Sequence, residues 1–143
     1  MIKPSLSELE HLVDRELADP AEQDAHAMEL VHRGSARLVA VTLGRDGALL
    51  ATPDGVVRMP TIDVPVHSTV GAGDAFLAGV TLASARGATP SEALAWGTAA
   101  GATAAACAGT ARLRRADVAA RHRQLTRARF ARAVTAGQVL SAP

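Results

Sequence analysis

The chain has 143 residues, a length that fits one domain, and 48% of them are apolar, which is enough to build a core. Its 15 Lys and Arg residues nearly balance its 14 Asp and Glu residues, and the net charge of +1 argues against a general nucleic-acid or membrane-surface binder. The single cysteine, Cys107, has no partner for an internal disulfide, which is typical of a reducing compartment. Because Lys3 interrupts the start of the chain before any long apolar run, we expect no signal peptide and a cytoplasmic location.

The first part of the chain predicts two helices. Residues 5–17 have the apolar spacing of a helix, with Ser5 or Ser7 as the N-cap. A second helix is expected to begin near Pro20 and to end just before Gly34. The expected apolar face of the first helix consists of Leu6, Leu9, Leu12, Val13 and Leu17.

Strand signals follow. Residues 37–44, "RLVAVTLG", form an apolar run ended by Gly44, which is typical of a strand buried on both faces, as in parallel sheets. Residues 47–60 predict two short strands around a Pro-Asp-Gly turn. Residues 61–66, "TIDVPV", predict one more strand, limited by Pro65. Only the first of these runs has the character of a central strand, so we expect the sheet to need further neighbours.

The remainder is predicted to be helical. Helices are expected at 73–86, from Pro90 to about residue 106, and within 109–125. Residues 126–143 show little pattern and are expected to form a tail of unclear structure. The order of helices and strands predicts an α/β layered fold.

Two stretches of unusual charge have both a binding and a structural interpretation. Residues 93–111 contain no charged side chain, but their Ala, Gly and Thr give weak drive for lipid insertion, so they predict a buried helix. The basic run at 112–132 is either a nucleic-acid arm or a solvated helix face, and we interpret it as the latter.

A glycine-rich stretch, "HSTVGAGDAFLAGV" at 67–80, carries the strongest chemical signal. Two glycines let the chain turn tightly, and the free amides at the start of the following helix form an anion site. A carboxylate at the same place repels a phosphate, so its presence there suggests that it has a chemical task. We therefore expect the amides of Ala72, Gly73 and Asp74 to hold developing negative charge while the Asp74 carboxylate takes a proton from an attacking hydroxyl, as in phosphoryl transfer. The alternative is that Asp74 is a helix cap and the glycines form a simple turn.

Two neighbouring phosphate-binding motifs are excluded. A dinucleotide fingerprint has a third glycine where this chain has Phe76, and a Walker A loop needs a lysine that the stretch lacks. The five histidines, at 11, 26, 32, 67 and 122, are scattered and show no zinc-ligand spacing.

The segment "STVGAGDAFLAG" resembles the second signature of the ribokinase-like carbohydrate kinases, also called the phosphofructokinase B family. Three further stretches resemble the family in the same order, namely "KPSLSEL", "VTLGRDGALL" and the closing "GTARLRRADV". The resemblance implies a ribokinase-like αβα layered fold, of which this chain is the C-terminal nucleotide-binding half only. Residues 1–125 would then be the C-terminal part of a carbohydrate kinase domain and 126–143 a tail. The front half, which in the family supplies the sugar pocket and lid strands, is expected to be missing.

The resemblance also implies residue roles. Asp74 would be the catalytic base, and the anion hole would be formed by Gly71, Ala72 and Gly73. Nucleotide binding would involve Lys3, Thr42, Gly44, Gly47 and Gly73. Glu8 would support Mg²⁺ indirectly, but Ser5 replaces the asparagine that the family pairs with this glutamate, and its shorter side chain weakens the expected metal support.

The implied activity is ATP-dependent phosphoryl transfer to a hydroxyl of a phosphorylated ketohexose, with ATP and Mg²⁺ as cofactors. Ser68, together with Lys3 and Pro4, makes the chain similar to the branch of 1-phosphofructokinases and tagatose-6-phosphate kinases. The alternative is a non-catalytic remnant or split nucleotide-binding module that acts with another chain. We expect self-association or a complementary N-terminal half as partner, and neither nucleic acid nor membrane.

Overall fold

The structure is a computed structural model that describes residues 1–107 and 112–135, with side chains through residue 128. Its elements follow the order α1 (Leu6–Val13), α2 (Pro20–His32), β1 (Val39–Thr42), a 3-10 turn (Gly44–Asp46), β2 (Ala48–Thr52), β3 (Gly55–Met59), α3 (Ala72–Ala85), α4 (Pro90–Ala105) and α5 (Arg115–Thr135).

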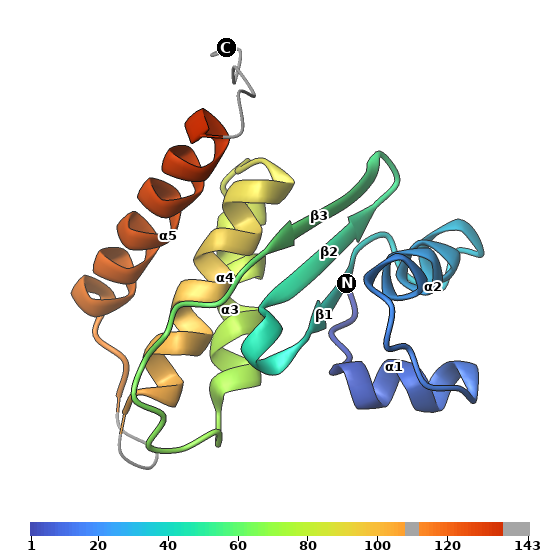
Figure 1. Ribbon diagram of the computed structural model, residues 1–143, viewed down its shortest axis with the longest axis horizontal. Helices are drawn as coiled ribbons and strands as arrows, with labels where there is room; N and C mark the ends of the chain where they lie inside the picture. Colours follow the sequence, from blue (N-terminus) through green and yellow to red (C-terminus); the bar gives the residue numbers. More distant parts are fainter. Residues whose placement is uncertain (108–111, 136–143) are drawn as a thin grey trace.

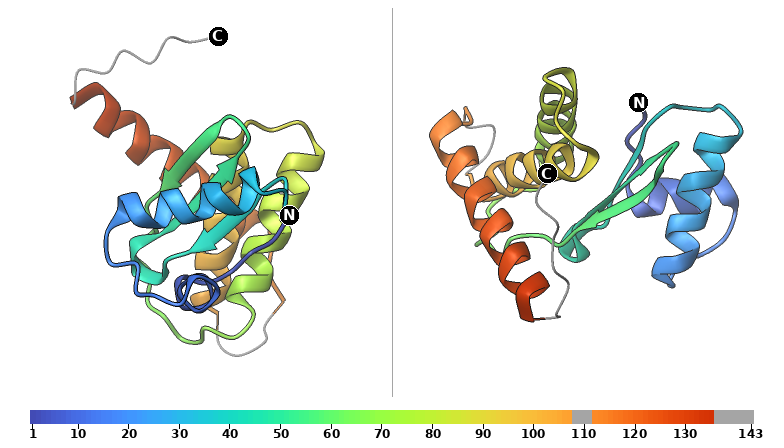
Figure 2. Two further views of the ribbon diagram at one scale, coloured as in Figure 1. Left: turned by 90° about the vertical axis from the view of Figure 1, so that its right-hand side faces the viewer. Right: turned by 90° about the horizontal axis from the view of Figure 1, so that it is seen from above.

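The elements form three layers. Figure 1 shows the sheet between α1 and α2 on one side and α3, α4 and α5 on the other, and the view from above in Figure 2 shows the same division. The strand order is β1-β2-β3, with both neighbouring pairs antiparallel. On the free side of β1, Ile2 and Ser5 form single parallel bridges with Val39 and Thr42. The predicted α/β layered fold is confirmed.

The sheet is buried on both faces because alternate side chains of a strand point to opposite sides. Val39, Val41 and Leu49 pack with α1 and α2, whereas Ala40 and Leu50 pack with α3 and α4. The prediction of a strand buried on both faces is confirmed. Strand β1 pairs with β2 in the antiparallel direction, however. Its parallel pairing is restricted to the two bridges with Ile2 and Ser5.

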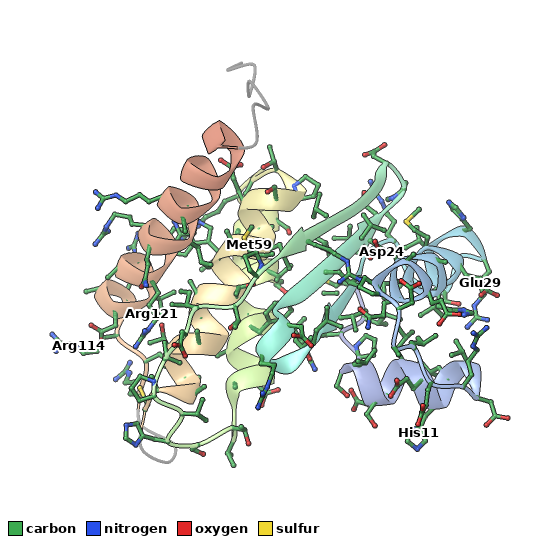
Figure 3. All side chains as sticks on the ribbon, in the orientation of Figure 1. His11, Asp24, Glu29, Met59, Arg114 and Arg121 are labelled. Atoms are coloured by element: carbon green, nitrogen blue, oxygen red, sulfur yellow. The ribbon has the colours of Figure 1, made fainter. Side chains whose placement is uncertain are left out.

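The outer strand, β3, is tied to both helical layers. Arg58 Nε donates to Asp24 Oδ1 of α2 at 2.9 Å, and Figure 3 shows Asp24 on the side of α2 that faces the sheet. Met59, which is 2% exposed, lies between the sheet and α4. The hairpin predicted over 47–60 is therefore confirmed and is anchored on both sides.

The strand predicted over 61–66 is wrong. These residues leave β3 as an irregular segment that has no strand partner among the described residues. Pro60 and Pro65 lack the amides that a ladder requires, so the segment does not continue the sheet. Instead it crosses the layer of α3 and α4, where Ile62 is buried.

The first helix is shorter than its apolar pattern predicted. Ser5 is the N-cap, and Asp14 ends the helix because its backbone turns left-handed, at φ 53°. Leu17 is fully buried although it lies beyond the helix, and Leu12 is 59% exposed. The second helix is confirmed, with Asp19 as its N-cap and Pro20 in its first turn.

Glycines set the distance between α3 and α4. A β-carbon added to Gly79 would lie 2.8 Å from the Trp96 carbonyl oxygen, and one added to Gly97 would lie 2.3 Å from Val80 Cγ2. The two helices therefore approach closely where Gly79 and Gly97 face the other helix without side chains of their own. The part of the charge-free stretch that lies in α4 is mostly buried, as predicted. No described helix is long and apolar enough to span a membrane.

The last helix packs on α4 through an aromatic contact. The rings of Trp96 and His122 stack with centroids 4.0 Å apart and an interplanar angle of 11°. Burial lowers the pKa of His122 below its ordinary value of 6.5, with Glu92 opposing this effect and Arg123 adding to it. The helix continues past residue 125 to Thr135, so the first part of the expected tail is helical, and residues 136–143 lie outside the described residues.

Candidate functional site

A cleft of about 950 Å³ lies where five segments of the chain meet. Its wall is formed by the N-terminal segment, the glycine turn between β1 and β2, the irregular segment after β3, the start of α3 and one face of α4. Of the residues predicted for the site, the cleft brings together Lys3, Glu8, Thr42, Gly44, Gly47, Ala72 and Gly73. Gly71 and Asp74, which flank Ala72 and Gly73 in the sequence, do not line the cleft.

The start of α3 has the form of an anion site. Gly71 is the N-cap and adopts the left-handed conformation, with φ of 78°, and no side chain caps the helix. The Ala72 amide donates to the Thr69 carbonyl oxygen at 3.2 Å. The amides of Gly73 and Asp74 have no acceptor among the described residues, so they remain available to a ligand, as expected at a helix N-terminus.

The Lys3 ammonium lies over this helix start. Lys3 Nζ is 3.4 Å from the position of a β-carbon on Gly73, and Lys3 Cε is 3.6 Å from it. The missing side chain of Gly73 therefore makes room for the lysine. A positive side chain and the positive end of α3 act together on the same point of the cleft, which favours a phosphate there.

The Asp74 carboxylate stands apart from that point. Gly73 lines the cleft, whereas Asp74 is exposed outside it. Consecutive side chains of a helix point about 100° apart, so the Asp74 side chain does not share the direction of the Gly73 position that Lys3 covers.

The glycine turn between β1 and β2 forms a fixed wall of the cleft. Gly44 and Gly47 have positive φ angles of 60° and 94°. The Leu43 amide donates to the Gly47 carbonyl oxygen at 2.8 Å, and the Gly47 amide donates to Gly44 at 3.2 Å. The Thr42 amide donates to the Pro4 carbonyl oxygen at 3.1 Å, which holds the N-terminal segment against β1.

Glu8 closes a capping box with Ser5. Its Oε2 accepts from the Ser5 amide at 2.6 Å and from the Ser5 hydroxyl at 3.0 Å, and the Glu8 amide donates to Ser5 Oγ at 3.2 Å. The hydrogen bond from the Ser5 amide is the main cause that lowers the pKa of Glu8, followed by that from the Ser5 hydroxyl. The glutamate is therefore held as an ionised group on the cleft wall, with its second oxygen unengaged.

The cleft's acidic residues fit a phosphate-bound magnesium ion rather than a protein-held one. Glu8 and Asp63 line the cleft, and the described residues contain no group of three or more His, Cys, Asp and Glu side chains that could hold a metal. Mg²⁺ in nucleotide sites is commonly held by one or two carboxylates together with substrate phosphates. Two acids on the wall match that requirement.

Sequence reasoning missed two parts of the wall. Asp63 lies in the segment predicted to be a strand, and Thr98 lies on the charge-free stretch that predicts a buried helix. The spacing of Thr98, Gly101, Ala102 and Ala105 is a helical face, which was the available signal. The closing Gly109-Thr110 segment lies outside the described residues.

Comparison with known proteins gives consistent matches. Residues 1–116 match the pfkB family of carbohydrate kinases. The chain is 42% identical to the ATP-dependent 6-phosphofructokinase isozyme 2 of Mycobacterium tuberculosis over 118 residues, which are 82% of this chain and 35% of that protein. It is also 42% identical to a 1-phosphofructokinase of Haloferax volcanii over 95 residues, which are 66% of this chain and 31% of that protein.

The structural match agrees. The crystal structure of Escherichia coli phosphofructokinase-2 in complex with substrates and products has a TM-score of 0.81 and 35% identity, over 87% of this chain and 40% of that one. The chain spans about a third of the length of the curated relatives it matches. The resemblance found in the sequence, and the fold implied by it, are confirmed.

Proposed function

The chain belongs to the pfkB family of carbohydrate kinases, and from this premise we propose that it carries the nucleotide side and the general base of an ATP-dependent sugar-phosphate kinase. The acceptor we propose is a hydroxyl of a phosphorylated ketohexose, because the relatives described above are named phosphofructokinases. The observation that carries the proposal is the Lys3 ammonium above the free amides of α3 in a cleft of nucleotide size.

Each residue of the site then has a defined task. Lys3 and the amides of Gly73 and Asp74 hold the phosphate oxygens at the start of α3 and stabilise the negative charge that develops on them. Gly44 and Gly47 allow the nucleotide to approach the main chain closely. The Asp74 carboxylate, on the residue after Gly73 at the same helix start, accepts the proton of the attacking hydroxyl.

The acidic residues of the cleft would support a magnesium ion that is bound mainly by the phosphates. Mg²⁺ supplies charge neutralisation on the phosphates when it is bound with ATP. Glu8 and Asp63 would hold this ion, directly or through its water shell. Ser5 engages one oxygen of Glu8, so a single oxygen of that carboxylate is left for this task.

Replacing the proposed base tests the mechanism. Asp74→Asn keeps the shape of the side chain but cannot accept the proton, and loss of a general base costs about 10²- to 10⁴-fold in rate. We expect ATP affinity, measured by calorimetry, to stay close to that of the unmodified chain. Asp54→Asn, in the exposed hairpin turn, is the matched control and should leave turnover unchanged. Near-normal turnover of the Asp74 variant would remove this residue from its role.

A second candidate is a nucleotide-binding module that acts only with another polypeptide. Val66 and Val70, beside the cleft and the anion site, are 63% and 66% exposed, and Leu82 on α3 is 53% exposed. Contiguous exposed apolar patches mark contact surfaces, and we infer that Val66 and Val70, four residues apart before α3, belong to such a surface.

Light scattering and turnover assays on the purified chain distinguish the two candidate functions. We expect it to self-associate in light scattering, and the pair Val70→Thr and Leu82→Gln to reduce that association. Turnover by the isolated chain with ATP, Mg²⁺ and fructose phosphates would exclude the module. A monodisperse monomer with a sharp, reversible melt would contradict the expected need for a partner.

A further inference from the structure

The charges of this chain are separated along its sequence. Residues 112–132 carry eight arginines and one aspartate, whereas the rest of the chain carries seven Lys and Arg residues and 13 Asp and Glu residues. The net charge of +1 therefore combines a strongly basic segment with an acidic remainder. Charge of one sign that gathers in one region produces a field that reaches beyond single contacts.

The basic surface belongs to α5. Arg115, Arg123 and Arg127 are exposed, and they lie within about 120° of one another around the helix, since successive residues are turned by about 100°. None of the three forms an ion pair with a described residue. Arg58 on β3, in contrast, is paired with Asp24. The described part of the protein therefore supplies no counter-charge to the arginines of α5.

The acidic surface lies on α1, α2 and the connection between them. Residues 1–32 contain eight Asp and Glu residues but only two Lys and Arg residues. Asp14, Glu16 and Asp19 are exposed, and none of them forms an ion pair with a described residue. Glu29, exposed on α2, is paired with His26, whose charge depends on its protonation. This surface therefore carries negative charge that is largely unpaired.

The two surfaces lie on opposite sides of the fold. Figure 1 shows the sheet and α4 between α5 and the layer of α1 and α2, and the view from above in Figure 2 shows the same separation. In Figure 3, Arg114 points outward on the α5 side and Glu29 lies at the outer edge of the α2 side. The surfaces are too far apart to meet within one molecule, but they can meet between two molecules.

We propose that α5 of one copy docks on the layer of α1 and α2 of a second copy through complementary charge. The contact joins two different surfaces, so it is head-to-tail and can continue along a row of copies. Exposed ion pairs are individually weak and are screened by salt, so the association is reversible and depends on salt.

A second copy fits α5 better than a nucleic acid does. The chain itself carries the complementary surface, and its net charge of +1 offers a long polyanion little overall attraction. Arg123, Arg127, Glu16 and Glu29 do not line the cleft, so the contact does not depend on the proposed nucleotide site.

Light scattering at two salt concentrations tests the electrostatic character of the contact. The screening length is about 30 Å at an ionic strength of about 0.01 M and about 3 Å at about 1 M. We expect an average mass well above the 14.6 kDa of the monomer at the low ionic strength, and a fall towards that mass at the high one. The measurement is repeated on the Val70→Thr, Leu82→Gln chain, in which the apolar association is reduced and the part that depends on salt should remain.

Two variants remove the complementarity from one side each. Arg123→Glu with Arg127→Glu makes α5 more acidic, and Glu16→Lys with Glu29→Lys makes the layer of α1 and α2 more basic. Each variant alone should associate about 10-fold more weakly, because weak attractions are lost and like charges then face each other. An equimolar mixture of the two variants should recover the association, because each supplies the surface that the other has lost.

The control carries the same change of net charge away from α5. Arg37→Glu with Arg86→Glu replaces two exposed arginines outside this helix, and its association should stay close to that of the unmodified chain. All the replaced side chains of the three variants are exposed, so circular dichroism should show the same helix content in each.

Four results would overturn the inference. A mass that does not change with salt would exclude an electrostatic contact. Equal losses in the α5 variant and the control would assign the effect to net charge rather than to α5. A mixture that does not recover would show that the two surfaces do not pair. Binding of duplex DNA that the α5 variant loses, without recovery in the mixture, would assign α5 to a nucleic acid instead.

Discussion

Replacing Gly47 with alanine should disrupt the junction of the hairpin and the cleft. The backbone at Gly47 has φ of 94°, and a β-carbon there would lie 2.0 Å from the Met59 carbonyl oxygen. It would also lie 2.8 Å from Pro60 Cα and from the Thr61 amide nitrogen. All three atoms belong to the main chain, so no side chain can rotate away to make room.

The expected loss of stability has two parts. Holding a non-glycine residue at this φ costs about 1–3 kcal/mol. Pushing the main chain at the end of β3 out of its packed position costs about 1–3 kcal/mol more. The free energy of unfolding should therefore fall by about 4 kcal/mol, which lowers the urea midpoint by about 2 M for a slope near 2 kcal/mol/M.

Urea unfolding followed by circular dichroism measures this loss, and Gly34→Ala provides the control. Gly34 has a similar φ of 77°, but a β-carbon there would meet nothing within 4 Å. The control should therefore lose only the backbone part, about 1–2 kcal/mol. Equal midpoint shifts for the two variants would refute the steric argument, whereas a Gly47 variant that is unfolded without urea would agree with it.

Two further predictions concern the helices behind the cleft. Gly97→Ala would bring a β-carbon to 2.3 Å from Val80 Cγ2 and force α3 and α4 apart, with a loss of about 3 kcal/mol in urea unfolding. Adding Val80→Ala should recover part of the lost free energy of unfolding. No recovery would contradict the predicted clash between the new β-carbon and Val80. Burial lowers the pKa of His122 below 6.5, so the unfolded chain binds this proton more readily, and stability should be full above pH 6.5 and decline as the pH falls through the lower folded pKa. The free energy of unfolding should fall less between pH 7.5 and pH 5.5 in His122→Gln than in the control His11→Gln. An equal fall in the two variants would contradict the role of His122 in this pH dependence.

Local signals in the sequence determined much of this protein. The apolar run at 37–44 identified the buried strand, because a strand with both faces covered needs apolar side chains at every position. Pro20 and Gly34 marked the limits of α2, since each acts on the backbone within one turn. The Gly71 to Asp74 stretch indicated a turn, a free helix start and an acid, and the structure has all three.

Tertiary structure decided where the site lies and which further residues belong to it. The pattern at 61–66 favoured a strand, but Pro60 and Pro65 lack ladder amides and no described strand pairs with the segment. It lines the cleft instead, and this places Asp63 at the site. Thr98 looked like one more small residue of a packed helix, and only the meeting of α4 with α3 and the N-terminal segment shows that its hydroxyl faces a cleft. Helix periodicity tells which residues share a face, but it does not tell what that face meets. That depends on contacts between segments far apart in the chain, such as Lys3 with Gly73, which no local preference encodes.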